Sequence, residues 1–102
     1  MAVITVTAEN FEEEVLNSKV PVLVDFWASW CGYCRMLAPL VEQVSEEVTD
    51  AKFCKLDTDN DPDLADKYDV NSLPTLLVFK NGELVDRSIG FVQKDQIAAL
   101  VK

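Results

Sequence analysis

The stretch that decides the fold and the chemistry of this chain is Trp30-Cys31-Gly32-Tyr33-Cys34. It lies between an apolar run over residues 20–27 and a helical pattern over residues 35–48. Two cysteines separated by two residues at a strand-to-helix junction can alternate between dithiol and disulfide with little movement of the backbone. This spacing therefore predicts a redox site built on the pair.

The segments on either side of the cysteines predict a buried strand followed by a long helix. Residues 22–27 are apolar except for Asp25, and a continuous run of this length is typical of a central, parallel strand that is covered on both faces. Apolar residues then recur at helical spacing as far as residue 48, so we expect a helix from about Cys34. Pro39 lies inside this helix and should kink it, because proline has no N–H and its ring crowds the preceding turn.

Shorter patterns predict the remaining elements. Strands are expected over residues 2–6, 51–57, 75–80 and 83–89, and helices over residues 7–17, 62–68 and 94–101. Thr7 and Asp61 are the expected N-caps, and Asn81-Gly82 predicts a tight hairpin turn. This order predicts an α/β fold in a single domain, residues 1–102, with a central mixed sheet of about five strands flanked on both faces by about four helices.

The composition excludes several classes of function. The net charge is −9, from 9 basic and 18 acidic residues, so a nucleic-acid backbone would be repelled. No apolar run approaches the roughly 20 residues that cross a bilayer, and no Lys or Arg precedes Lys19 as in a secretory signal. An odd count of 3 cysteines is unusual for a disulfide-stapled secreted domain, which favours a cytoplasmic location.

Metal sites are the main alternative use of these residues. Zinc in a closed structural site takes four ligands, but the chain offers only Cys54 as a third sulfur and has no His. Residues 57–61 resemble the start of a calcium loop, yet Pro62 replaces the required Gly and Tyr68 replaces the bidentate Glu. We therefore expect no metal, and we interpret Cys54 as an inert, buried residue on its strand. A purely structural disulfide is also disfavoured, because so short a loop removes little entropy from the unfolded chain.

The position of the cysteine pair assigns a role to each sulfur. Cys31 stands where a strand ends and a helix begins, and the free N–H groups and dipole of a helix N-terminus stabilise a thiolate there. The thiolate is the attacking species in disulfide exchange, so Cys31 is the predicted nucleophile. Cys34 lies one helical turn further in, where it should be more buried and able to attack the mixed disulfide.

Several separated motifs together resemble the thioredoxin family. The matching residues are Asp25-Phe26-Trp27-Ala28, Trp30-Cys31-Gly32, Cys34, Pro39, Leu73-Pro74-Thr75 and Phe79-Lys80-Asn81-Gly82-Glu83. The resemblance covers essentially the whole chain. It implies the thioredoxin fold and the activity of a protein-disulfide reductase that binds no cofactor. The implied partners are client proteins with disulfides and a thioredoxin reductase, either a flavoprotein or a ferredoxin-linked enzyme, and we expect the protein to be a monomer.

The resemblance also implies roles for residues outside the pair. The peptide bond between Leu73 and Pro74 should be cis, with Pro74 against the cysteines. Asp25 should be a buried carboxylate behind Cys34, with a pKa raised by desolvation, and should take the proton of that thiol. Lys55 matches the family's partner of this carboxylate. The alternative for Asp25 is a strand-end residue that reaches water.

An apolar rim that receives the client is the last implied feature. The predicted client-binding residues are Trp30, Gly32, Tyr33, Leu73, Pro74 and Gly90. We call Trp30, Leu73, Pro74 and Gly90 the client collar. A collar with exposed backbone suits many unrelated clients, because main-chain hydrogen bonds do not depend on the partner's sequence.

Two residues depart from the family pattern. Tyr33 stands where thioredoxins usually have Pro, and Ser72 where Gly is usual. Unlike Pro, Tyr33 has an N–H close to where the Cys31 sulfur should lie, and this donor would stabilise the thiolate and make the pair more oxidising. A disulfide oxidase or isomerase of the same fold therefore stays open as an alternative. A binding module in which the cysteines are incidental is the other.

Overall fold

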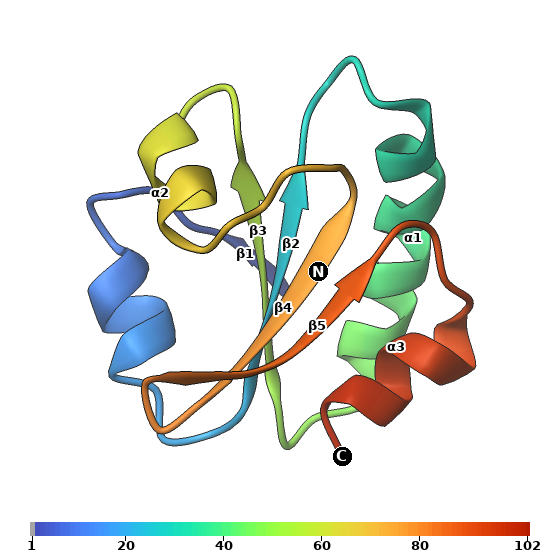
Figure 1. Ribbon diagram of the computed structural model, residues 1–102. Coiled ribbons are helices and arrows are strands. Elements are labelled where there is room, and N and C mark those ends of the chain that lie inside the picture. Colours follow the sequence, from blue (N-terminus) through green and yellow to red (C-terminus); the bar gives the residue numbers. More distant parts are fainter. Residues whose placement is uncertain (1) are drawn as a thin grey trace.

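The computed structural model describes residues 2–102, which form five strands and four helical segments (Figure 1). The strands are β1 (Val3–Thr5), β2 (Val22–Trp27), β3 (Lys52–Asp57), β4 (Thr75–Lys80) and β5 (Glu83–Ile89). The helical segments are the π-helix η1 (Glu12–Leu16) and the α-helices α1 (Gly32–Glu47), α2 (Pro62–Lys67) and α3 (Lys94–Leu100). The predicted α/β class and mixed sheet are thus confirmed.

The sheet has the strand order β1-β3-β2-β4-β5, so β2 is its central strand, as predicted. Residues 22–26 of β2 are all buried, which agrees with their continuous apolar pattern. β2 runs parallel to β3 but antiparallel to β4. The predicted parallel pairing is therefore wrong on one side, because an apolar run reports only that both faces are covered and carries no information on strand direction.

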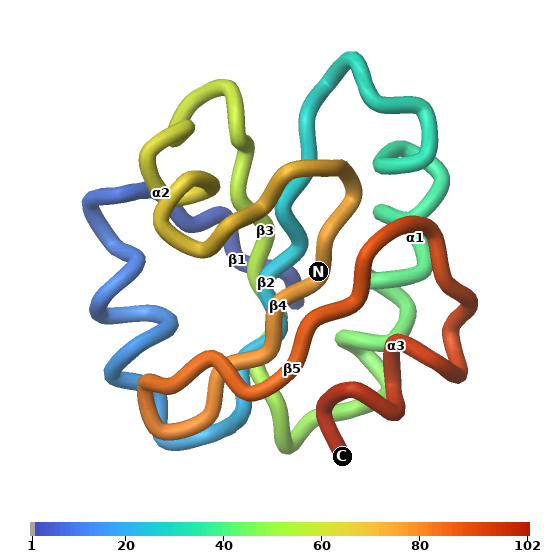
Figure 2. The backbone as a smooth tube through the Cα atoms, viewed as in Figure 1, coloured from blue at the N-terminus to red at the C-terminus, as the bar shows by residue number. Residues whose placement is uncertain are grey.

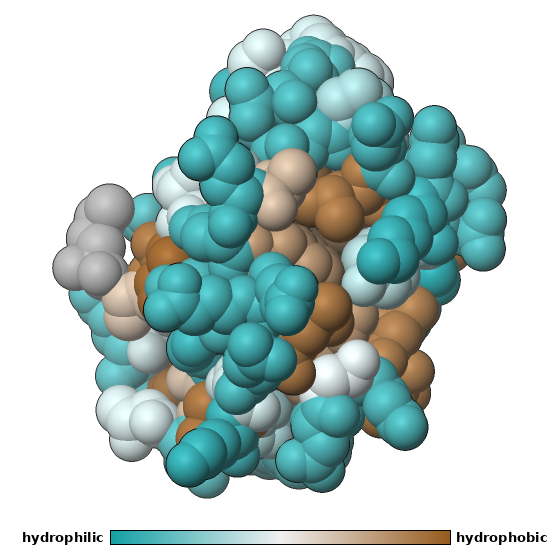
Figure 3. Space-filling model, turned by 90° about the vertical axis from the view of Figure 1, so that its left-hand side faces the viewer, coloured by the Kyte–Doolittle hydropathy of each residue, from teal (hydrophilic) through white to brown (hydrophobic). Residues whose placement is uncertain are grey.

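Helical segments cover both faces of the sheet. In Figures 1 and 2, η1 and α2 lie on one side of it, and α1 and α3 on the other. One core cluster lies under η1 and α2 and includes Phe11, Phe26 and Phe79, and the other lies under α1 and α3 and includes Phe53 and Ile97. Full burial of each such side chain stabilises the fold by about 1.5–3 kcal/mol. The outer face over η1 and α2 is largely hydrophilic, with separate apolar patches (Figure 3).

The first helix differs from its prediction. The Thr7 hydroxyl does accept a hydrogen bond, from the Glu9 N–H at 3.2 Å, but residues 8–10 form a turn and the helical segment is only η1. The Asn10 side chain accepts a bond of 2.7 Å from the Thr7 N–H, and the Asn10 N–H bonds to Thr7 O at 3.2 Å, which closes a turn before η1. Asn17 N–H then bonds to Glu12 O, five residues back, at 2.9 Å, as in a π-helix.

The predicted cap at Asp61 is also corrected. Asp61 occupies the N-cap position of α2, but its carboxylate makes no capping bond to that helix. Its Oδ1 instead accepts a hydrogen bond of 3.1 Å from the Ala8 N–H, and its Oδ2 one of 2.8 Å from Asn60. The carboxylate therefore joins the segment before η1 to the start of α2.

Two local features fix the path of the chain before and after β4. Asn81 and Gly82 both have positive φ, 54° and 80°, as a two-residue turn between β4 and β5 requires. On β5, Arg87 donates hydrogen bonds to Tyr68 O at 2.5 Å and to Asp69 O at 3.2 Å. These bonds fix the end of α2, from which the chain continues to Pro74.

Candidate redox site

Cys31 is the N-cap of α1. The chain leaves β2 at Trp27, turns with a hydrogen bond from Cys31 N–H to Ala28 O at 3.2 Å, and enters the helix at Gly32. Cys31 has extended backbone angles (φ −93°, ψ 112°), and its Sγ accepts a hydrogen bond of 3.2 Å from the Cys34 N–H. This geometry places the sulfur at the positive end of the helix dipole, where negative charge is stabilised.

The structure changes two expectations about this turn. The helix begins at Gly32, two residues earlier than predicted, because Cys31 itself caps it. The donor to the Cys31 sulfur is the Cys34 N–H and not the Tyr33 N–H. An N-cap side chain bonds to the second or third N–H of its helix, and the cysteine here bonds to the third.

Cys34 is the deeper of the two thiols. It is 2% exposed, against 7% for Cys31, which is the order expected for a resolving cysteine and a nucleophile. Burial, together with the hydrogen bond to Cys31, raises the pKa of the Cys34 thiol above its ordinary value. Cys34 is therefore held protonated at neutral pH and needs a base before it can attack a disulfide.

Asp25 is the candidate for that base. It lies within β2, is 3% exposed, and is not the strand-end residue of the alternative interpretation. Burial raises the pKa of its carboxyl from 3.8 to about 7, while the charge of Lys55, its register partner on β3, lowers it. Its Oδ1 has no hydrogen-bond partner within residues 2–102 and is free to accept a proton.

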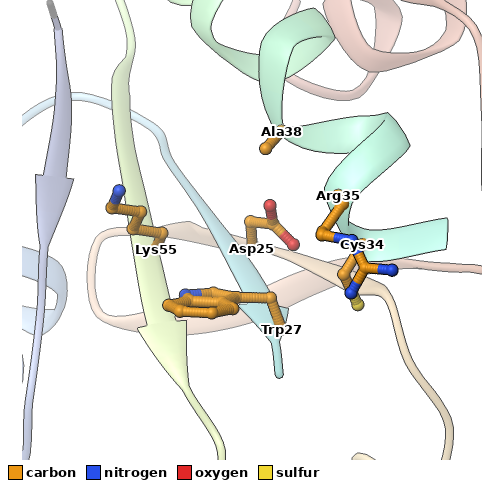
Figure 4. A pocket seen from close by; sticks show the side chains of 6 residues that line it. All are labelled: Asp25, Trp27, Cys34, Arg35, Ala38 and Lys55. Carbon is orange, nitrogen blue, oxygen red and sulfur yellow. The ribbon is translucent and has the colours of Figure 1, made fainter. Parts of the chain in front are cut away.

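A cavity of about 150 Å³ joins these groups. Asp25, Trp27, Cys34, Arg35, Ala38 and Lys55 line it. Figure 4 shows the Asp25 carboxylate between Lys55 on one side and Cys34 on the other, with the Trp27 indole below. Trp27 also packs against the two cysteines, as expected for a residue beside the site.

The structure brings Leu73 of the predicted client collar against the cysteines and joins Pro74 to Gly90. The Leu73–Pro74 bond is cis, and Leu73 packs against the cysteine pair. The Gly90 N–H donates to Pro74 O at 2.8 Å, and Gly90 has φ +96°, which favours glycine. Trp30, one residue before Cys31, is 69% exposed, and its Nε1 donates to Asp59 at 3.1 Å.

The sequence interpretation did not select Arg35, Met36 or Asp59. Arg35 anchors its guanidinium to Ser29 O at 2.8 Å, and Met36 is 55% exposed on the same helix. The available signal was an apolar side chain at position 36 on the outer face of an amphipathic helix. Cys54, in contrast, is fully buried in the cluster under η1 and α2, away from the redox pair.

The structure describes no membrane-crossing helix and no metal-binding cluster. Within residues 2–102, every helix is too short or too polar to span a bilayer. Over the same residues, no three His, Cys, Asp or Glu side chains are grouped so that they could hold a metal ion.

A cysteine that caps a helix, a second thiol one turn behind it and a buried carboxylate on the same cavity as that thiol define a thiol–disulfide oxidoreductase. Comparison with known proteins gives the family, since the Thioredoxin family model matches residues 2–102. The thioredoxin of Pyropia yezoensis is 48% identical over 100 residues, which cover 97% of this chain and 94% of that protein. Thioredoxin 1 of Synechococcus elongatus is 48% identical over 91% of this chain and 88% of its own length. Thioredoxin M5, chloroplastic, of rice is 44% identical over 97% of this chain and 58% of that protein.

The chain belongs to the thioredoxin family. It is a thioredoxin-type protein-disulfide reductase. Its partners are proteins with disulfides and a reductase that supplies electrons to the oxidised cysteine pair.

Proposed function

We propose that Cys31 and Cys34 reduce client disulfides in two exchange steps. The Cys31 thiolate attacks one client sulfur, the client S–S bond breaks, and the second client sulfur leaves as a thiolate. Cys34 then attacks Cys31 Sγ, which releases the first client sulfur and leaves a Cys31–Cys34 disulfide. The observation that supports these roles is the hydrogen bond from Cys34 N–H to a Cys31 sulfur that caps α1.

Asp25 supplies the base for the second step. The Cys34 thiol must lose its proton before it attacks, and its raised pKa makes that loss unfavourable without an acceptor. The pKa of the Asp25 carboxyl, about 7, matches an acceptor that is half ionised at neutral pH and can pass the proton on. Lys55 keeps that pKa from rising further, because its positive charge stabilises the carboxylate.

The client lies across the client collar and the exposed surface of Gly32 and Tyr33. Trp30, which is exposed, and Leu73, which packs against the cysteines, supply apolar contact. The backbone hydrogen bond between Gly90 and Pro74 holds the rest of the collar together.

We place the protein in the cytoplasm as a monomer that works without a bound cofactor. The reduced pair is a two-electron store in itself, so the oxidised pair needs only a partner with a dithiol of lower potential to restore it. That partner is a thioredoxin reductase, either a flavoprotein or a ferredoxin-linked enzyme. It must approach the same face as the clients, since Cys31 is the outer sulfur.

The test is reduction of insulin disulfides with each class of reductase, using the wild type and three variants. Cys31→Ser should abolish turnover, and Cys34→Ser should trap client bound to Cys31. Cys54→Ala is the matched control and should keep wild-type turnover, because Cys54 lies in the other core cluster. Turnover that survives in Cys31→Ser would refute the assigned roles. Full biological activity in a double variant, Cys31→Ser with Cys34→Ser, would favour a binding module.

The reduction potential separates a reductase from an oxidase or isomerase. A potential near about −270 mV is typical of thioredoxin, whereas oxidising relatives lie at about −180 to −120 mV. Tyr33 in place of Pro is the feature that favours the oxidising class, but its N–H is not the donor to Cys31. We therefore expect a value in the reducing range.

A further inference from the structure

An open groove of about 580 Å³ lies on the first two turns of α1, next to Cys31. We call it the α1 groove, and its lining residues are Gly32, Tyr33, Arg35 and Met36. Leu73 of the client collar, just before β4, packs against the cysteines, whereas the α1 groove extends along the helix that follows Cys31. The two surfaces therefore adjoin the same sulfur from different directions.

Two large apolar side chains are exposed in the α1 groove. Tyr33 is 63% exposed and Met36 is 55% exposed. Residues three apart in a helix lie on the same face, so the two side chains are neighbours there. Adjacent exposed apolar side chains of this size, beside a hollow, are typical of a surface that binds a partner. A flexible methionine suits contact with side chains of several shapes.

Arg35 gives the α1 groove a fixed positive charge. One guanidinium nitrogen, Nη1, donates to Ser29 O at 2.8 Å, which holds the side chain at the edge of the site beside Cys34 (Figure 4). A guanidinium has five N–H donors, so most of them stay available to a partner. This cation lies in a chain of net charge −9, so a positive charge beside the cysteines is a distinctive feature of the surface.

We propose that the α1 groove is a second client subsite that binds an apolar side chain next to a carboxylate in the segment flanking the attacked cysteine. The proposal rests on the function proposed above. The occupant is a client because Gly32 follows Cys31 directly, so a chain bonded to Cys31 must run over the surface next to it. Tyr33 and Met36 contact the apolar side chain, and Arg35 binds the carboxylate with a charge-assisted hydrogen bond.

The test uses peptides that carry one cysteine in a disulfide with a chromogenic aromatic thiol. Attack by Cys31 on the peptide sulfur breaks this bond, and the released aromatic thiolate is followed by absorbance with the reduced protein. Three peptides differ only in the two residues beside the cysteine, which are Leu-Glu, Leu-Lys or Ser-Glu. Each pair is placed before the cysteine in one set and after it in another.

The wild type should react with the Leu-Glu peptide about two- to fivefold faster than with the Leu-Lys peptide in one of the two sets. This ratio should approach one in Arg35→Gln and in about 0.5 M salt, which screens exposed charges. Met36→Ser should remove the preference for Leu-Glu over Ser-Glu. A ratio between peptides cancels any general effect of these changes on the reactivity of the cysteines.

Lys19→Gln and Val20→Ser are the matched controls. They remove the same kinds of side chain, an exposed cation and an exposed apolar group, just before β2 begins and so at the opposite end of that strand from Cys31. Both should keep the wild-type ratios. Equal rates for the three peptides in both sets, with insulin reduction intact, would overturn the subsite alone. Failure to reduce the peptides and insulin alike would overturn the proposed function.

Discussion

Replacing Asp25 by Asn should stabilise the protein, and increasingly so as the pH rises. In the folded state burial raises the pKa of the Asp25 carboxyl from 3.8 to about 7, against a partial lowering by Lys55. The folded protein therefore holds a proton that the unfolded chain has lost between about pH 4 and pH 7. The stability that this proton contributes is complete below the pKa of Asp25 in the unfolded chain, and it is lost as the pH rises through the pKa of Asp25 in the folded protein. The amide of the Asp25→Asn variant does not titrate in this range, so the variant does not suffer this loss.

The size of the effect follows from the two pKa values. The Asp25 pKa rises from 3.8 to about 7 on folding, and each pH unit corresponds to about 1.4 kcal/mol. The ionised carboxyl therefore lowers the free energy of unfolding by about 4 kcal/mol. Part of this cost is already present at pH 5, where the unfolded carboxyl has ionised. Between about pH 5 and about pH 8, the free energy of unfolding of the wild type should fall by about 2–3 kcal/mol relative to the variant.

Urea denaturation at several pH values in this range measures the difference directly. Comparing variant with wild type cancels the contributions of all groups that the two proteins share, and the range stops well below the raised pKa values of Cys34 and Cys54. The difference in melting temperature between variant and wild type should likewise grow as the pH rises. Should the two stability curves run parallel from pH 5 to pH 8, Asp25 would not carry the raised pKa, and its role as the base for Cys34 would fall with it.

Three further changes test other parts of the site, and a fourth, Gly82→Ala, serves as the comparison for Gly90→Ala. Lys55→Gln removes the charge that lowers the Asp25 pKa, so the midpoint of the pH dependence with which Cys34 resolves a mixed disulfide should move upward. Stopped-flow rates of resolution from pH 6 to pH 9 measure this midpoint, which should stay at the wild-type value in the control Lys67→Gln. Gly90→Ala forces a side chain into positive φ and should cost about 1–2 kcal/mol in urea, with slower client reduction. Gly82→Ala should cost more, because its Cβ would also meet Leu16 O at 3.0 Å, yet client reduction should be normal. Tyr33→Pro leaves the Cys34 N–H in place as the donor to Cys31, so the reduction potential of the pair should move by less than about 30 mV in a glutathione titration. A larger drop would support the hypothesis that the Tyr33 N–H makes the pair more oxidising.

Secondary structure could be predicted where one physical signal dominates. β2 has an uninterrupted apolar pattern, and β4 and β5 are joined by Asn81-Gly82, whose positive φ values only a tight turn explains. The form of η1 could not be predicted, since it depends on a π-type hydrogen bond from Asn17 N–H to Glu12 O, which no spacing of residues signals. The antiparallel pairing of β2 with β4 is equally absent from any local pattern, because it depends on the path of the chain after α2.

Some features of the candidate site could likewise be predicted from the sequence, and others could not. The spacing of Cys31 and Cys34 predicts redox chemistry by itself, and the order of their burial follows from one turn of helix. Contacts between distant segments are different. The bond from Gly90 to Pro74 and that from Trp30 to Asp59 join residues 16 and 29 positions apart, and no periodicity reports such pairs. The anchor of Arg35 on Ser29 was missed because a lone charge in a sequence is usually interpreted as solvated.

The burial of Asp25 cannot be relieved without loss of the base that it provides. Both the cost in stability and the pKa near 7 come from the same desolvation, so a change that wets the cavity would lower both. A fully hydrated carboxylate with a pKa near 3.8 would be ionised at neutral pH but too weak a base to take the proton of a thiol whose own pKa is raised. Asn at this position would give a more stable protein that resolves its mixed disulfides slowly. Stability and the rate of resolution should therefore change in opposite directions across any series of substitutions in this cavity that alters the exposure of Asp25.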